Sequence, residues 1–384
     1  MSAPDPVVLP HLVRVEAVHV RVPFRRPILD ATGEYTHRRS WLLRVVDEDG
    51  NEGLGEAALD PISTDTTIGE LARLMREMVP ALADGRAPVW SELTAEGEPG
   101  RAAMAAVDGA LVALLAAQAA GATALDARTA TPPATIPVSA TISFGGPNAG
   151  ADAAAQAIEL GFGTLKLRAG FERTTDQLVD RLRAIRGAVG PEPRLRIDVG
   201  GAWDLETAAE RIAAIEPFRI EYVEQPLAAW DLTGHAALRE RVRVPIALDE
   251  TIDSEGSARA ALSDKAADVL IVKPARVGGL AATLRIADAA SAVGASAVLG
   301  TFFETGVGIA AVLRIAAAMR GERGLEGPPA LETAHGLATA GLLIHDLLAA
   351  PLAIEKGRMA VPDVVALDEG EVDRYTLERF EAGA

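Results

Sequence analysis

The sequence predicts an α/β protein in which a (β/α) barrel follows a smaller α+β domain. Short apolar runs alternate with alanine-rich helical windows between residues 136 and 348, as in a parallel sheet with crossover helices. Residues 11–59 instead alternate between apolar and polar side chains, as antiparallel strands do. The 384 residues also exceed the roughly 250 of a single barrel, so a second domain is expected.

The N-terminal part predicts an antiparallel sheet followed by helices. Strands are expected at 11–22, 41–46 and 53–57, and helices at 67–83 and 101–120. Between the first two strands, the polar residues 23–39 predict a long loop that acts as a flap. The alanine-rich residues 102–120 carry Asp108 and Gln118, so we expect a buried helix of a soluble domain there rather than a membrane span. Residues 130–135 predict a linker.

The C-terminal part predicts the strands of a barrel. Seven apolar runs are short enough for buried parallel strands, and each gap can hold one crossover helix. The runs span residues 136–142, 164–167, 195–199, 220–223, 246–248, 269–272 and 297–299. A doubly wound open sheet is the alternative, but the glycine-rich first turn of a nucleotide-binding sheet is missing, since Gly278-Gly279 is a lone pair.

Composition favours an enzyme for small molecules over a protein that binds nucleic acid or a membrane. The net charge of -17 would repel phosphates and anionic lipids, and no dense run of Lys and Arg counters it. The chain has no cysteine, which excludes disulfides, thiol nucleophiles and cysteine-based metal sites. Because residues 1–10 lack the long apolar run of a signal peptide, a cytoplasmic location is expected.

Three of the predicted barrel strands end in a carboxylate. Asp198, Glu224 and Asp249 follow consecutive apolar runs, each about one βα unit after the last, so we expect them side by side on adjacent strands. Carboxylates in such a group repel one another unless a cation lies among them. Because no His or Cys accompanies them, the ligands are all oxygen, which favours Mg²⁺, with Mn²⁺ as a possible substitute.

Cationic residues end the strands on either side of these carboxylates. Lys273 follows the next strand along the chain, and Lys166 and Arg168 lie on the preceding strand with the same orientation. We expect these three residues to be catalytic. Glu304 adds a carboxylate at the following strand end, and we expect Glu304 and Thr301 to contact the substrate. Alone, each charge suits a helix cap or a solvated loop, but the series together indicates an active site.

The strand-end residues resemble the enolase superfamily, and within it the muconate-lactonizing subgroup. The matching segments are Lys166-Leu167-Arg168, Arg196-Ile197-Asp198-Val199, Val223-Glu224-Gln225-Pro226, Leu248-Asp249-Glu250-Thr251 and Val272-Lys273-Pro274. Residues 23–35 are similar to the mobile capping loop of the family, and residues 53–57 and 105–121 are similar to its cap domain.

The resemblance implies a modified TIM barrel, (β/α)7β, under an α+β N-terminal cap that the C-terminal tail completes. The expected domains are a cap at 11–130, a catalytic barrel at 136–348 and a returning segment at 349–384. It also implies Mg²⁺-dependent removal of a proton alpha to a substrate carboxylate, through a metal-stabilised ene-diolate. The expected partner is a small-molecule carboxylate, and a homo-oligomer is expected.

Two residues depart from the family pattern. Arg168 replaces the second lysine of the K-x-K motif, and a guanidinium with a pKa above roughly 12 is a poor base at neutral pH. Lys273 therefore becomes the stronger candidate for the base, provided that metal and neighbouring cations lower its pKa. Gly200 replaces the usual Asn two positions after the first metal ligand, so a side-chain contact that would support the metal ligands is lost.

The expected reaction is a dehydration like that of o-succinylbenzoate synthase, an enzyme of menaquinone biosynthesis. Residues 331–339, followed by Asp346 and 351–352, are similar to the tail of those enzymes, as are residues 27–37. An N-acylamino acid racemase or dipeptide epimerase is the alternative, although it needs a base on each face of the carbon, which Arg168 disfavours. A muconate-type cycloisomerase and a non-catalytic enolase-like binding protein also remain open.

Overall fold

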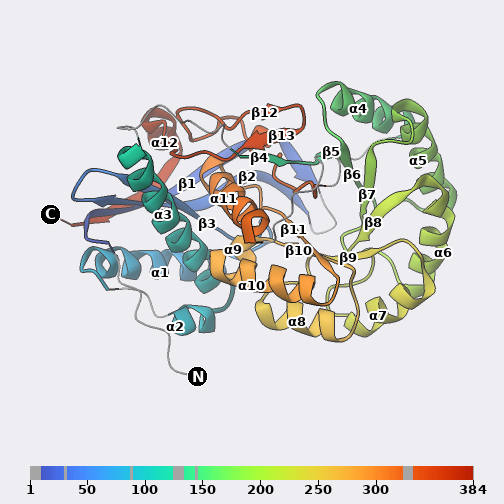
Figure 1. Cartoon of the computed structure of the whole chain (residues 1–384), viewed down its shortest axis with the longest axis horizontal. Helices are drawn as coiled ribbons and strands as arrows, with labels where there is room; N and C mark the ends of the chain where they lie inside the picture. Colours follow the sequence, from blue (N-terminus) through green and yellow to red (C-terminus); the bar gives the residue numbers. More distant parts are fainter. Residues whose placement is uncertain are drawn as a thin grey trace.

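A four-stranded antiparallel sheet and a curved parallel sheet of seven strands form the frame of the molecule (Figure 1). The computed structural model describes residues 10–29, 33–86, 90–123, 134–142, 146–322 and 332–383. Residues 1–9, where no signal peptide is expected, lie outside the described residues, as do most of the predicted linker and residue 331.

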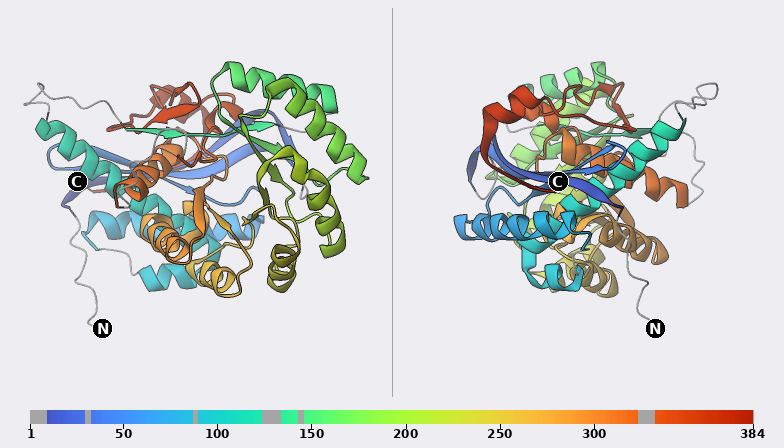
Figure 2. Two further views of the ribbon diagram at one scale, coloured as in Figure 1. Left: turned by 45° about the vertical axis from the view of Figure 1, so that its right-hand side comes forward. Right: turned by 90° about the vertical axis from the view of Figure 1, so that its left-hand side faces the viewer.

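The antiparallel sheet contains the first and the last of the described strands. Its strands are β1 (Leu12–Leu29), β2 (Glu34–Asp47), β3 (Glu52–Ala58) and β14 (Thr376–Ala382), in the order β14-β1-β2-β3. Figure 2 shows the C-terminal strand lying along the N-terminal sheet, where it pairs with β1 in antiparallel fashion. The C-terminal tail therefore completes the cap, as the resemblance implied.

The predicted loop at residues 23–39 was wrong, because its described residues apart from Gly33 belong to strands. β1 continues to Leu29 and β2 begins at Glu34, so the segment forms a β-hairpin that projects from the sheet. The register between the two strands breaks between Pro23 and Ile28. Pro23 and Pro27 lack the N–H that a regular ladder needs, and an irregular register accommodates them.

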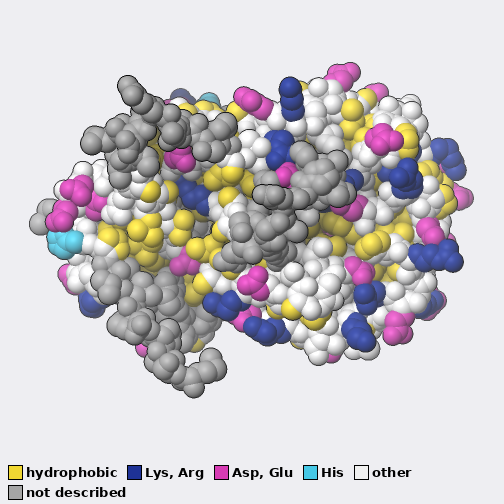
Figure 3. Space-filling model, in the orientation of Figure 1, with side chains coloured by type: hydrophobic (Ala, Val, Ile, Leu, Met, Phe, Trp, Pro, Cys, Tyr) yellow, Lys and Arg dark blue, Asp and Glu magenta, His cyan; other side chains and the backbone are white. Residues whose placement is uncertain are grey.

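Two helices, α1 (Asp65–Ala83) and α3 (Gly97–Thr123), cover one face of the antiparallel sheet, and the short α2 (Trp90–Ala95) packs against α3. The sequence did not predict α2. Helix α3 is long and apolar enough to cross a membrane by length and composition, but it contributes many side chains to the core of the cap. It lies so close to β3 that a Cβ on Gly55 would be 1.9 Å from Ala106 O. Leu115 of this helix is 58% exposed. Hydrophobic side chains are visible on this part of the surface (Figure 3).

Along the chain, the strands of the parallel sheet alternate with helices. Its strands are β5 (Ala140–Ile142), β6 (Thr164–Arg168), β7 (Arg194–Asp198), β8 (Ile220–Glu224), β9 (Ile246–Leu248), β10 (Val269–Val272) and β11 (Ser296–Leu299). The helices are α4 (Pro147–Glu159), α5 (Thr175–Val189), α6 (Leu205–Ile215), α7 (Leu232–Arg241), α8 (Glu255–Ser263), α9 (Pro274–Val277), α10 (Gly279–Ala292) and α11 (Gly306–Glu322). They lie outside the strands (Figure 2).

Local sequence explains where several of these elements begin. Thr174, Asp204 and Ser254 each accept a hydrogen bond from the backbone N–H three residues later, and so cap α5, α6 and α8. The first predicted strand, 136–142, is divided in the structure. Its start is β4 (Thr135–Pro137), which pairs with β13 (Arg358–Ala360), and only its end, β5, joins the parallel sheet.

The segment around His335 closes the barrel. Val138 and His335 form a parallel bridge beside β5, and Gly336 N donates to Leu299 O of β11 over 2.8 Å. The His335 ring also contributes, since its Nδ1 accepts a hydrogen bond from Leu299 N at 3.0 Å. Seven β/α units are thus followed by one final extended segment, which confirms the (β/α)7β architecture.

Two carboxylates of the cap lie at the N-termini of barrel helices. Glu56 accepts hydrogen bonds from Thr305 N, Thr305 Oγ1 and Gly308 N at the start of α11. Asp108 of α3 accepts one from Leu280 N at the start of α10, over 2.9 Å. Negative side chains at helix N-termini satisfy free N–H groups and favour the helix dipole. These contacts join the cap to the barrel.

The segment after residue 348 contacts both parts. β12 (Ile354–Glu355) and β13 pair beside β4, and α12 (Glu369–Tyr375) leads into β14 of the cap sheet. The barrel and the cap each have a large apolar cluster of their own. The domain limits named above remain a prediction.

Candidate active site

The three predicted metal ligands lie at the ends of adjacent strands of the parallel sheet. Asp198 is the last residue of β7, Glu224 is the last of β8, and Asp249 follows β9 directly. Asp198 and Glu224 are register partners, which places them opposite each other across the strand pair. All three are buried, with at most 4% of each residue exposed. The fold therefore concentrates negative charge at one point on the carboxyl edge of the barrel.

The predicted cations lie against these carboxylates. Lys166 Nζ is 2.6 Å from Glu224 Oε1 and 2.9 Å from Asp198 Oδ2, so one ammonium joins the two acids. Arg168 Nη1 lies 2.6 Å from the same Asp198 Oδ2. On the other side, Lys273 Nζ donates to Asp249 Oδ2 over 2.7 Å. The structure thus brings together all six residues that the sequence predicted as metal ligands or catalytic groups.

Burial and charge act in opposite directions on the ionisation of this cluster. Burial disfavours the ammonium of Lys166, but the carboxylates of Asp198, Glu224 and Asp249 outweigh burial and raise its pKa. Burial also raises the pKa of Asp249, but Lys273, Arg276 and Lys166 outweigh it, and the net shift is well below the usual range. Burial raises the pKa of Glu224 to about 8, and the neighbouring carboxylates add to the effect of burial.

The residues present fit a hard divalent cation. The donor set is all oxygen, and Glu224 Oε2 is buried without a hydrogen-bond partner among the described residues. Among these residues, no three acidic or histidine side chains are gathered as a metal cage, and Lys166 Nζ lies between Asp198 and Glu224. Asp198, Glu224 and Asp249 are the side chains that would bind such a cation.

Two residues of this site were missed by sequence reasoning. Arg276 Nη1 lies 2.7 Å from Asp249 Oδ1, and its Nη2 lies 3.2 Å from Asp60 Oδ2 of the cap. The ring of Phe302 packs against two cations, with its centroid 5.1 Å from Lys273 Nζ and 4.7 Å from Arg276 Cζ. Arg276 lies three residues after Lys273, and one turn of helix brings it back to the same strand end. That spacing was a signal that could have identified Arg276.

Gln225 supports the carboxylates from behind. It adopts a left-handed backbone conformation, with φ of 42°, immediately after Glu224. Its Oε1 accepts a hydrogen bond from Asp249 N at 2.9 Å, and its Nε2 donates to Thr251 Oγ1 at 3.0 Å. Side chains that orient metal ligands in this way are part of a metal site.

The two predicted substrate contacts lie outside this ion-pair cluster. Glu304 is 2% exposed and accepts a hydrogen bond from Phe302 N, and burial together with the charge of Glu56 raises its pKa to about 7. Thr301 Oγ1 lies 3.0 Å from Thr339 Oγ1. Their contact with a substrate stays a prediction.

Comparison with known proteins identifies the family. Residues 149–366 match the family model described as "Enolase C-terminal domain-like". An o-succinylbenzoate synthase of Thermobifida fusca is 39% identical over 229 residues, which is 59% of this chain and 67% of that protein. The chain belongs to the enolase superfamily. It falls in the mandelate racemase and muconate-lactonizing subgroup of this superfamily.

Other relatives in the superfamily are named for different reactions. An L-Ala-D/L-Glu epimerase of Clostridium acetobutylicum is 28% identical over 316 residues, 79% of this chain and 85% of that protein. The crystal structure of a muconate lactonizing enzyme from Pseudomonas fluorescens superposes with a TM-score of 0.77 at 25% identity, covering 96% of this chain and 99% of that one. This enolase-superfamily chain is accordingly an enzyme of the lyase or isomerase type.

Proposed function

We propose that this protein uses Mg²⁺ to remove a proton alpha to the carboxylate of a small-molecule substrate, and that the reaction is a dehydration of the o-succinylbenzoate synthase type. One observation supports this proposal most: the cationic side chains on the two sides of the carboxylate cluster are different. The β6 side carries Arg168, a guanidinium that keeps its proton near neutral pH, and Lys166, which is held between two carboxylates. The other side carries Lys273, whose hydrogen-bonded carboxylate is Asp249.

Asp198, Glu224 and Asp249 would hold the Mg²⁺, which when bound supplies positive charge opposite the negative charge that develops on the substrate carboxylate. Mn²⁺ suits the same oxygen ligands. Lys166 and Arg168 add fixed positive charge on one side of the substrate. Both side chains are partly buried, which strengthens this effect because electrostatic interactions are stronger where water is excluded.

Lys273 is the base in this proposal. In its neutral form, it accepts the alpha proton as the carbon–hydrogen bond breaks. The resulting ammonium then donates that proton to the hydroxyl that leaves the neighbouring carbon on the same face. A carbon–carbon double bond forms and water departs, so no second base is needed. Phe302 covers Lys273 on one side and limits the access of water to it.

A racemase or epimerase is the second candidate, because lysines lie on both sides of the carboxylates. Lys166 on β6 and Lys273 after β10 contact different acids of the cluster, so each could face one side of an alpha carbon. The identity to epimerases over most of the chain adds to this candidate.

The test is a panel of carboxylic acids incubated with the full-length protein and Mg²⁺ in D₂O and followed by proton NMR. A beta-hydroxy acid that loses water, with no reaction in EDTA, supports the dehydration. Loss of the alpha-proton signal from both enantiomers of an N-acylamino acid would instead support the racemase. If no member of the panel exchanges its alpha proton with Mg²⁺ present, the proposed function is wrong.

A further inference from the structure

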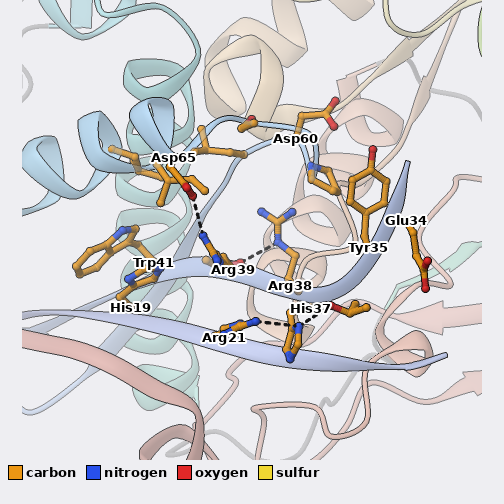
Figure 4. Close-up of a pocket in the computed structure, with 17 residues that line it drawn as sticks. His19, Arg21, Glu34, Tyr35, His37, Arg38, Arg39, Trp41, Asp60 and Asp65 are labelled. Carbon is orange, nitrogen blue, oxygen red and sulfur yellow. Dashed lines mark hydrogen bonds and ion pairs between the residues drawn. The ribbon is translucent and has the colours of Figure 1, made fainter. Parts of the chain in front are cut away.

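The chain has six histidines, and two of them are buried. His19 and His37 line a cavity of the cap, where the ring of His37 lies beside Arg21 (Figure 4). Of the two buried histidines, His335 closes the barrel. The other, His235 of α7, is 0% exposed and lies outside the ion-pair cluster. A fully buried imidazole needs hydrogen-bond partners, and those of His235 lead to the metal ligands.

Two backbone groups fix the tautomer of His235. Its Nδ1 lies 2.8 Å from the carbonyl oxygen of Asp231, which can only accept, so Nδ1 carries a hydrogen. Its Nε2 accepts a hydrogen bond from Leu227 N at 3.3 Å. Burial lowers the pKa of His235, while the carbonyl and the charge of Asp231 oppose burial. The ring is therefore neutral, and its acceptor nitrogen is turned toward the loop that follows β8.

The acceptor nitrogen of His235 contacts both the backbone and a side chain of this loop. Besides the bond from Leu227 N, Gln225 Nε2 lies 3.4 Å from His235 Nε2 and donates to Leu227 O at 3.0 Å. Gln225 has a φ of 42°, in the left-handed region that a residue with a Cβ rarely adopts. Such a conformation persists only where surrounding contacts maintain it, and His235 supplies two of them.

Gln225 in turn is joined to two of the three predicted metal ligands. Glu224 directly precedes it in the chain, and Gln225 Oε1 accepts hydrogen bonds from Asp249 N at 2.9 Å and Thr251 N at 3.3 Å. These bonds require the amide to turn its oxygen toward Asp249 and its NH₂ group toward His235. An acceptor on His235 favours this orientation of the amide, whereas a donor at that position would oppose it.

We propose that His235 is a positioning residue of the metal site, which acts on two metal ligands through Gln225. The side-chain hydrogen bonds of His235 within the described chain are with Gln225, Leu227 and Asp231, so it acts on the ligands through another residue. The inference rests on the metal site of the proposed function and adds to that site a side chain from a helix outside the strands. Without His235, Gln225 would lose contacts that maintain its backbone and its amide orientation.

The test is the affinity of the full-length protein for Mn²⁺, measured by electron paramagnetic resonance without a substrate. His235→Phe keeps the shape of the ring and removes the acceptor, and it should weaken Mn²⁺ binding roughly tenfold. His235→Gln, whose side-chain oxygen can accept from Leu227 N, should retain most of the wild-type affinity. In Gln225→Met, which lacks the connecting amide, the added His235→Phe change should weaken binding no further. His235→Asn keeps a donor for Asp231 O and lacks the distant acceptor, so it replaces His235→Phe if that variant does not fold.

His335→Phe is the matched control, because His335 is also buried and also accepts a hydrogen bond from a backbone N–H, that of Leu299. It should lower the Tm and leave the Mn²⁺ affinity at the wild-type value. The proposal is overturned if folded His235→Phe and His235→Asn bind Mn²⁺ as tightly as the wild type. It is also overturned if the loss of affinity is the same with Gln225 and with Met at that position, since His235 would then not act through Gln225. A wild-type protein that binds no Mn²⁺ would instead refute the metal site of the proposed function, and this role with it.

Discussion

Arg276 Nη1 lies 2.7 Å from Asp249 Oδ1 and 3.0 Å from Asp249 O, so one arginine holds both the side chain and the backbone of a predicted metal ligand. Its Nη2 contacts Asp60 of the cap at 3.2 Å. We expect Arg276→Met to lower kcat/KM by roughly 10- to 100-fold, as for other residues that orient metal ligands. Asp60→Ala should have a smaller effect, because Asp60 is more exposed and its contact is longer. Steady-state kinetics, with circular dichroism to check folding, measure both.

The control for this pair is Arg285→Met, which removes an exposed arginine of the adjacent helix that contacts Glu255. It should leave kcat/KM near the wild-type value. If Arg276→Met folds and is as active as Arg285→Met, then Arg276 does not orient Asp249.

Asp249→Asn should abolish activity and weaken metal binding while the fold is kept. The amide removes one anionic ligand and leaves Lys273 and Arg276 beside a neutral side chain. Titration of Mn²⁺ monitored by electron paramagnetic resonance measures the affinity directly, without a substrate. Asp253→Asn, an exposed acid in the loop that follows, is the control and should bind Mn²⁺ as the wild type does. Wild-type affinity in Asp249→Asn would contradict the assignment of this ligand.

Lys273→Ala should eliminate exchange of the alpha proton, because it removes the proposed base. Arg168→Lys should retain part of the turnover and acquire exchange on the second face of the carbon, since an ammonium can lose its proton where a guanidinium does not. The measurement is proton NMR in D₂O on both enantiomers of an N-succinylamino acid. Efficient exchange of both enantiomers by the wild type would be inconsistent with a single base.

Asp108→Asn should stabilise the protein above pH 6. Burial raises the pKa of Asp108 from 3.8 to about 6, so between these values the folded state binds more protons than the unfolded state. Stability is therefore lost as the pH rises through this window, and above it the buried carboxylate costs on the order of 3 kcal/mol. An asparagine oxygen can still accept from Leu280 N. Thermal unfolding should give Asp108→Asn a higher Tm than wild type at pH 8 and a similar Tm at pH 4.

Asp288→Asn provides the comparison for this measurement, because Asp288 is an exposed acid of α10. Its difference in Tm from wild type should not change between pH 4 and pH 8. A Tm for Asp108→Asn below that of the wild type at pH 8 would mean that the negative charge at the helix N-terminus outweighs the cost of burial.

The sequence predicted the barrel and the ion-pair cluster well because both depend on local patterns. Each of these apolar runs is followed by a charged residue, and a parallel strand places that residue at the carboxyl edge of the sheet. The positions of Asp198, Glu224 and Lys273 could therefore be predicted from the sequence. Contacts between distant segments have no such pattern. The position of Phe302 against Lys273, and that of Asp60 against Arg276, depends on how the cap docks.

The hairpin was missed for a related reason. Pro23, Pro27 and the polar residues around them are typical of a loop, but the pairing of β1 with β2 outweighs the local preference. The resemblance implied the final segment of the (β/α)7β barrel, but its place was not predicted, because a single bridge at His335 is too short to produce a periodic pattern.

The positions of Glu56 and Asp108 limit how the active site can open. If the cap swung away as one body, it would withdraw both carboxylates and leave the first turns of α10 and α11 without partners for their N–H groups. Opening by such a rotation therefore carries a penalty at two helices at once. The β1–β2 hairpin is tied to the C-terminal half of the chain as well, because Phe24 forms a bridge with Leu343 and Pro23 O accepts a hydrogen bond from Ile344 N at 2.9 Å. A substrate should thus reach the carboxylate cluster without a rotation of the whole cap.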